Sequence, residues 1–230
     1  MNDGGENLFP EMAKLVPQAA KGRASVRHIT VDAEGGRTAS YVYGEFKNPS
    51  PPGTYITLRI MNDAGESQVM MSDFYYERAT CVEVVQRAHG DVLIAGLGLG
   101  MILHPILQKQ EVRSVTVIER FQDVVDLISP TLPRDSRLTV ITDDIFQWQP
   151  PDGRRYDVIW FDIWPDIEAC RLPEMRQLSR RFRPSLNDSN PQCWMESWHR
   201  RETSEAMWRQ KLRQMESQAG AGDKTKPNLL

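Results

Sequence analysis

Asp91-Val-Leu-Ile-Ala-Gly-Leu-Gly-Leu-Gly100 is an apolar run that ends in alternating glycines. The run has the composition of a buried strand, and glycines permit a tight turn that lets backbone approach a ligand closely. A helix-like stretch, 101–109, follows, and a second apolar strand, 115–118, ends on Glu119. This order predicts a βαβ unit with an acid roughly 20 residues after the glycine turn. The arrangement is typical of a nucleoside site, in which the acid accepts hydrogen bonds from both ribose hydroxyls.

Strand-like and helix-like segments alternate through the rest of the chain. The expected strands are 92–96, 114–119, 137–141, 156–161 and 192–197, and the expected helices are 100–110, 121–129, 145–148, 172–182 and 200–216. Strands separated by helices favour an α/β fold with a doubly wound, mostly parallel, Rossmann-like sheet. Few residues remain after the last of these strands, so we expect the sheet to be short at that end.

The N-terminal third has a different pattern. Short β-type runs at 26–31, 39–46, 55–61 and 67–71 are separated by turn signals rich in glycine, proline and asparagine, which predicts a small antiparallel β region. A helical period then covers 74–88. We therefore divide the chain into a flexible arm (1–24), the β region (25–75), a Rossmann-like domain (76–216) and a disordered tail (217–230).

The composition limits the setting and the partners of the chain. A net charge of -3 gives no electrostatic signature of nucleic-acid binding, so we expect a small-molecule partner. The three cysteines are far apart and form no CxxC motif, which argues against a disulfide framework or a zinc site and favours a cytoplasmic protein. No stretch approaches the roughly 18 apolar residues of a membrane span, so we expect no membrane partner. A homodimer is one assembly that the sequence allows.

Acidic side chains recur where the predicted strands end. Glu119, the pair Asp143-Asp144 and Asp162 each follow an apolar run. Ligands of an open parallel sheet bind outside the carboxyl ends of its strands, so we expect these acids to share one edge with the glycine turn. Each feature also has a simpler interpretation. The turn could bind nothing, Glu119 could be solvated, and Asp143 or Asp144 could cap a helix that starts near Ile145.

This pattern resembles the class I S-adenosylmethionine-dependent methyltransferase fold, and more closely its spermidine synthase branch, over roughly residues 55–165. The family's glycine motif falls on 96–101, its ribose acid on Glu119, and the aspartate that reads adenine on Asp144. Its proton-accepting aspartate falls on Asp162 and its tyrosine on Tyr76. The resemblance implies that Asp162 and Tyr76 are catalytic. It also implies that S-adenosylmethionine, or its decarboxylated form, is held by Gly96, Gly98, Gly100, Glu119, Asp143 and Asp144.

Three departures from that family bear on the reaction. Leu99 replaces the aspartate that holds the amino end of the decarboxylated donor, Glu77 replaces a histidine, and Ile163-Trp164 replaces a serine pair. These changes keep the nucleoside half of the site and remove much of the polyamine half. We therefore expect a methyltransferase with an unidentified small-molecule acceptor, for which an amine is one candidate. An aminopropyltransferase and a non-catalytic nucleoside-binding module are the alternatives.

Individual residues near the expected acceptor side keep two interpretations. Asp162 is the candidate base for an amine acceptor. Tyr76 either orients a ligand or packs as a core tyrosine, and Trp164 either walls the acceptor site or packs in the core. We expect His104 and His199 to be structural or exposed.

Overall fold

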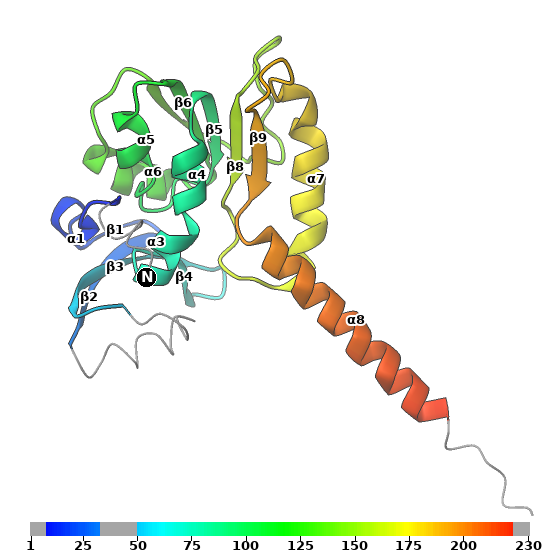
Figure 1. Ribbon diagram of the computed structural model, residues 1–230. Coiled ribbons are helices and arrows are strands. Elements are labelled where there is room, and N and C mark those ends of the chain that lie inside the picture. Colours follow the sequence, from blue (N-terminus) through cyan, green and yellow to red (C-terminus); the bar gives the residue numbers. More distant parts are fainter. Residues whose placement is uncertain (1–7, 33–49, 223–230) are drawn as a thin grey trace, which may run out of the picture.

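The computed structural model describes residues 8–32 and 50–222, with the backbone alone described for 213–222. In the described chain, a small antiparallel sheet packs beneath a larger parallel sheet (Figure 1). The predicted strand at 39–46 lies outside the described residues.

The small sheet confirms the predicted N-terminal β region. Its strands, in spatial order, are β1 (Ala19–Lys21), β2 (Ala24–Val31), β3 (Gly53–Met61) and β4 (Ser67–Ser72). Each neighbouring pair is antiparallel.

The large sheet is doubly wound and parallel. Its spatial order is β7 (Leu138–Thr142), β6 (Val112–Glu119), β5 (Gly90–Ala95), β8 (Val158–Phe161) and β9 (Trp194–Ser197), and every described pairing is parallel. The chain winds outward from β5 to β7 and then returns to the other side of β5 to form β8 and β9. The Rossmann-like fold predicted from the sequence is therefore confirmed.

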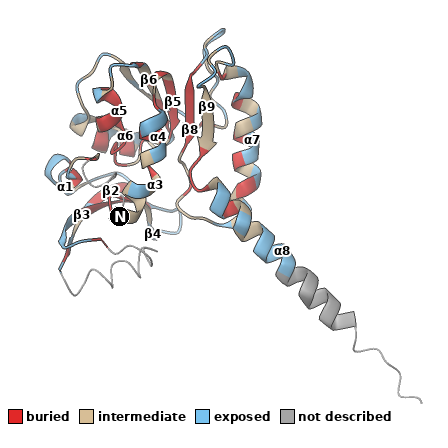
Figure 2. Ribbon diagram, in the orientation of Figure 1, coloured by how far each residue is buried: buried red, intermediate tan, exposed pale blue. Residues whose placement is uncertain are grey.

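Helices cover both faces of this sheet (Figures 1 and 2). One face packs against α4 (Val82–Arg87), α5 (Leu103–Gln108), α6 (Gln122–Ile128) and the small sheet, and the other packs against α7 (Leu172–Phe182). Alternating strand residues separate the two cores: Val92 and Ile94 enter the first, and Leu93 and Ala95 enter the second. This alternation explains why β5 is apolar from residue 92 to its end. The short 3-10 turns are η1 (Ser129–Thr131), η2 (Ala169–Arg171) and η3 (Arg183–Ser185).

The N-terminal segment corrects one prediction. Residues 8–24, assigned from sequence to a flexible arm, contain α1 (Met12–Leu15) and β1 and are packed. Phe9, Met12 and Val16 are buried in the first core. The ring of His28 lies 2.8 Å from the carbonyl oxygen of Val16 and fixes this segment to β2. These three apolar side chains are spaced so that they lie on one buried face of the segment. Charged residues between them obscure this apolar spacing in the sequence.

Two predicted helices also differ from the structure. The helix expected over 74–88 is divided into α3 (Tyr75–Thr80) and α4, with buried Cys81 between them at φ -90° and ψ -6°. The helix expected at 145–148 is a turn, in which the carbonyl of Asp144 accepts hydrogen bonds from the N–H groups of Gln147 and Trp148.

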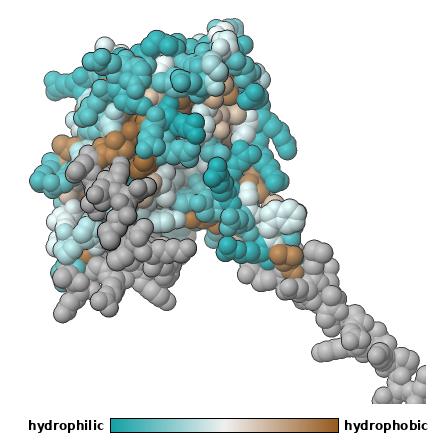
Figure 3. Space-filling view, viewed as in Figure 1, coloured by the Kyte–Doolittle hydropathy of each residue, from teal (hydrophilic) through white to brown (hydrophobic). Residues whose placement is uncertain are grey.

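The last helix, α8 (Arg200–Gly222), extends away from the body of the molecule (Figure 1). Residues 217–222, predicted to belong to a disordered tail, are therefore helical, and 223–230 lie outside the described residues. Trp208 and Leu212 of α8 are large apolar residues exposed to solvent. The face of the whole molecule seen in Figure 3 is mostly hydrophilic. In the described chain no helix is both long enough and apolar enough to span a membrane.

A buried carboxylate fastens the amino ends of β5 and β8. Asp157 is 2% exposed, and it accepts hydrogen bonds from the side chains of Asn187, Asn190 and Arg113 and from the N–H of Asp91. Burial alone would raise the pKa of Asp157, but these donors lower it to about 2. Since the ionised form is favoured by the fold, Asp157 stabilises the protein above its unfolded pKa of 3.8.

We expect Asp157→Asn to lower the free energy of unfolding at pH 7 by about 2 kcal/mol. The difference from the parent should shrink as the pH falls from about 4 toward 2, because the native carboxylate is then protonated. Urea denaturation at pH 7 and pH 3 measures both quantities, with the exposed Asp63→Asn as the matched control. An equal difference at both pH values would contradict this role.

Candidate functional site

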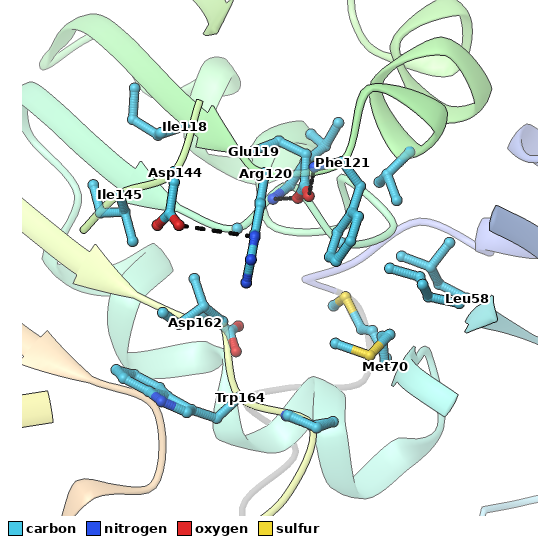
Figure 4. A pocket seen from close by; sticks show the side chains of 18 of the residues that line it. Leu58, Met70, Ile118, Glu119, Arg120, Phe121, Asp144, Ile145, Asp162 and Trp164 are labelled. Carbon is cyan, nitrogen blue, oxygen red and sulfur yellow. Dashed lines mark hydrogen bonds and ion pairs between the residues drawn. The ribbon is translucent and has the colours of Figure 1, made fainter. Parts of the chain in front are cut away.

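A cavity of about 350 Å³ opens at the carboxyl edge of the large sheet (Figure 4). Its walls come from β3 and β4 of the small sheet and from the segments that follow β5, β6, β7 and β8. The predicted site residues that line it are Gly96, Gly98, Glu119, Asp143, Asp144 and Asp162. The volume suits a small molecule, and the lining combines apolar side chains with a few carboxyl groups.

Gly96 brings the segments after β5 and β8 together. It has a φ of +96°, and a Cβ built on it would lie 2.0 Å from the carbonyl oxygen of Asp162. The Gly96 N–H donates to the carbonyl of Ile118 at 2.9 Å, and the Asp162 N–H donates to the carbonyl of Ala95 at 2.8 Å. Glycine is therefore required by both the backbone conformation and the available space.

The other two glycines of the motif have different surroundings. A Cβ on Gly98 would lie 2.3 Å from the sulfur of Met71, a residue of β4. The sulfur also lies 3.2 Å from the backbone nitrogen of Leu99, so the glycine turn contacts the small sheet directly. Gly100 packs against Leu132 and does not line the cavity. The structure therefore does not place it where a ligand-holding residue was expected.

Glu119 lies between the glycine turn and α6. Its carboxyl group is 7% exposed and accepts hydrogen bonds from the N–H groups of Leu97, at 2.8 Å, and Phe121, at 2.9 Å. Burial raises the pKa of Glu119, although these backbone donors favour its charged form. The backbone N–H groups of Arg120 and Gly98 also favour the charged form, so backbone donors from both the glycine turn and the segment after β6 surround this carboxyl group.

Asp143 and Asp144 lie at the end of β7. The Asp144 Oδ1 accepts a hydrogen bond from the Phe146 N–H at 2.9 Å, so it stabilises the turn as well as lining the cavity. Its Oδ2 lies 3.8 Å from Nε of Arg120, an ion pair beyond hydrogen-bond distance. The Asp143 Oδ1 accepts a hydrogen bond from the N–H of Asp144.

Asp162 is half-buried on the side of the cavity opposite Asp144 (Figure 4). Burial raises its pKa to about 7, and the indole N–H of Trp160 offsets part of that rise. That N–H makes no hydrogen bond of normal length within the described part of the chain, so its interaction with Asp162 is weak. Asp162 therefore changes charge near neutral pH.

Glu77 is a second acid beside Asp162 that the sequence analysis did not select. Its carboxyl oxygen accepts hydrogen bonds from the N–H and the hydroxyl of Ser72, at 2.7 and 2.6 Å. Burial raises the pKa of Glu77 to about 8, the Ser72 donors oppose that rise, and the charges of Asp162 and Asp73 add to it. The only signal in the sequence was that a glutamate stands here where the spermidine synthases, which the chain resembles, have a histidine.

Tyr76 lies outside the cavity lining. Its ring stacks on His199, with centroids 5.6 Å apart, and burial is the main cause that raises the pKa of its hydroxyl. His199 is buried and has a φ of 52°, which is strained for a residue other than glycine. Tyr76 and His199 thus pack together at the start of α8, and the structure does not bring Tyr76 to the predicted site residues.

Trp164 both lines the cavity and packs in the core, the two roles that the sequence left open. It lines the cavity (Figure 4), yet it is 4% exposed and its indole N–H donates to Glu174 of α7 at 2.7 Å. Its ring therefore forms a fixed wall. No group of three or more His, Cys, Asp or Glu side chains within the described ranges is placed to bind a metal ion.

No protein-family model matches this chain, and no curated protein matches it. Among similar solved structures is the N-methyltransferase NodS from Bradyrhizobium japonicum WM9, with 15% identity and a TM-score of 0.40 over 50% of this chain and 64% of that one. CcbJ, a methyltransferase from Streptomyces caelestis, has 18% identity and a TM-score of 0.39 over 48% and 45%.

A third structure is CalS10, an amino pentose methyltransferase from Micromonospora echinaspora solved with S-adenosylmethionine. It has 16% identity and a TM-score of 0.37 over 47% of this chain and 45% of that one. The chain therefore spans less than two thirds of the length of these methyltransferases. The fold assignment rests on the strand order of the large sheet.

We expect Gly96→Ala to destabilise the protein far more than Gly153→Ala. Gly153 also has a positive φ, +74°, but a Cβ there would meet nothing within 4 Å. The control should lose about 1 to 2 kcal/mol from backbone strain alone. Gly96→Ala should lose at least about 2 kcal/mol more, because its methyl group collides with the Asp162 backbone. Chemical denaturation measures both, and equal losses would contradict the close contact.

We expect Asp162→Asn to flatten the pH dependence of stability. The native pKa of Asp162, about 7, lies above the unfolded value of 3.8, because burial disfavours the charged form. The contribution of Asp162 to the free energy of unfolding is therefore fully present below pH 3.8 and is lost as the pH rises through 7. The variant should therefore be more stable than the parent at pH 8 by at least about 1 kcal/mol, a figure reduced for partial exposure. Denaturation at pH 4 and pH 8 tests this, with exposed Asp152→Asn as control. Parallel pH profiles would contradict the raised pKa.

Proposed function

We propose that this protein is a methyltransferase that uses S-adenosylmethionine and acts on a small-molecule acceptor in the cytoplasm. One observation carries the proposal: a single cavity is lined by the glycine turn, Glu119, Asp144 and Asp162 together. The similar solved structures are themselves methyltransferases.

The cavity lining fits a nucleoside. Gly96 and Gly98 present backbone to the cavity, because protein atoms of Asp162 and Met71 occupy the directions of their missing side chains. Glu119 would accept hydrogen bonds from the ribose hydroxyls. Ile118 and Ile145 supply apolar surface beside Asp144, where a purine base would be held and its amino group would meet a carboxylate. These residues would hold the donor, and Asp143 would support the turn that places Asp144.

Asp162 would serve as the base for the acceptor. S-adenosylmethionine supplies an already activated methyl group, so the protein must mainly position the acceptor and remove its proton. A pKa of about 7 leaves Asp162 partly ionised at neutral pH and able to accept that proton. The fixed indole of Trp164 would limit water on this side of the cavity. An amine is the acceptor group that matches such a base.

Aminopropyl transfer is less well supported. The position that would need an acid to hold the amino end of a decarboxylated donor is Leu99, which is fully buried. Its side chain belongs to the apolar core on the first face of the large sheet, where a carboxylate would be desolvated.

We expect the protein to bind S-adenosylmethionine and its demethylated product, and Glu119→Gln to weaken both by at least about tenfold. The reason is that an amide cannot accept from both ribose hydroxyls as a carboxylate does. Calorimetric titration measures the affinities, and the exposed Glu111→Gln is the matched control.

Two results would contradict the proposed site. Binding that is insensitive to Glu119→Gln would place the donor elsewhere, and no binding by a folded parent protein would exclude S-adenosylmethionine as the ligand. Donor binding without transfer to any amine in a broad panel would favour a non-catalytic nucleoside-binding module.

A further inference from the structure

Arg120 is a cation of the cavity that the proposed function leaves without a role. It directly follows Glu119, and its side chain extends across the cavity between Asp144 and Phe121 toward Asp162 (Figure 4). The side chain is 70% exposed, so it reaches the space that a ligand would enter.

The other two arginines that line the cavity already have partners. Arg171 makes two hydrogen bonds to the carboxylate of Asp166, at 3.0 and 2.8 Å. Arg23 pairs with Asp63 at 2.9 Å and donates to the carbonyl of Met61. Their guanidinium groups are therefore used to hold the cavity walls.

Arg120 differs because its donors remain available. Its ion pair with Asp144 measures 3.8 Å, which is too long for a hydrogen bond, and its guanidinium carbon lies 5.8 Å from the centre of the Phe121 ring. Within the described residues it makes no hydrogen bond to another side chain. A guanidinium group has five N–H donors in a planar fork that matches a carboxylate or a phosphate.

We propose that Arg120 is the anion-binding residue of this cavity and receives an acidic group of a bound ligand. The inference rests on the proposed function of the same cavity. Two sources could supply the same chemistry, namely the carboxylate at the amino-acid end of the donor or an acidic group on the acceptor.

The test compares Arg120→Gln with the parent, and with Arg155→Gln as an exposed control. Calorimetry measures the affinities for S-adenosylmethionine, for its decarboxylated form and for 5′-methylthioadenosine, which has the nucleoside but no amino-acid end. Inorganic phosphate is titrated in addition, into protein saturated with the demethylated product.

If Arg120 holds the donor carboxylate, Arg120→Gln weakens S-adenosylmethionine binding by at least about tenfold and leaves methylthioadenosine binding unchanged. If it holds an acidic group of the acceptor, donor affinities stay within about twofold while phosphate binding is lost. Both results support the inference and identify the source.

The inference is overturned if Arg120→Gln changes neither the preference for the carboxylated donor nor phosphate binding. It is also overturned if methylthioadenosine binding weakens as much as donor binding, because Arg120 would then contact the nucleoside. Failure of the proposed function gives a different result from failure of the Arg120 inference. In that case methylthioadenosine would not bind the parent protein at all.

Discussion

The segment after β5 can pass the segment after β8 only because residue 96 has no Cβ. A methyl group there would overlap the carbonyl oxygen of Asp162, and the φ of +96° would itself be strained for another residue. Backbone hydrogen bonds from Gly96 to Ile118 and from Asp162 to Ala95 tie the carboxyl ends of β5, β6 and β8 together at this point. The distance between the glycine turn and Asp162 is therefore set by backbone packing, and side-chain rotamers have no part in it.

The walls of the cavity come from a parallel sheet and an antiparallel sheet, which differ in how their side chains are buried. The parallel sheet is buried on both faces, so its central strands are mainly apolar and carboxyl groups collect at their carboxyl ends. The antiparallel sheet contributes an apolar wall through β3 and β4, and it meets the glycine turn at Met71. The carboxyl groups of the cavity and the apolar wall of β3 and β4 thus come from separate parts of the chain.

Much of this arrangement could be predicted from the sequence, because parallel topology alone brings successive strand ends to one edge. Glu119, Asp144 and Asp162 line one cavity for that reason. Contacts between elements could not be predicted in the same way. The packing of Gly100 on Leu132, the stacking of Tyr76 on His199 and the path of Arg120 across the cavity depend on tertiary neighbours that local periodicity does not encode. The fold of the N-terminal segment could not be predicted, because its hydrophobic pattern is weak and it contains two prolines.

Oxidation of the Met71 side chain would act directly on the contact between the small sheet and the glycine turn. The sulfur lies 3.2 Å from the Leu99 nitrogen and fills the space that a Cβ on Gly98 would occupy. Conversion of this thioether to a sulfoxide adds an oxygen atom and a dipole at the tightest point between the two sheets. The added atom would push the small sheet away from the turn or project into the cavity. Methionine sulfoxide reductases reverse this modification.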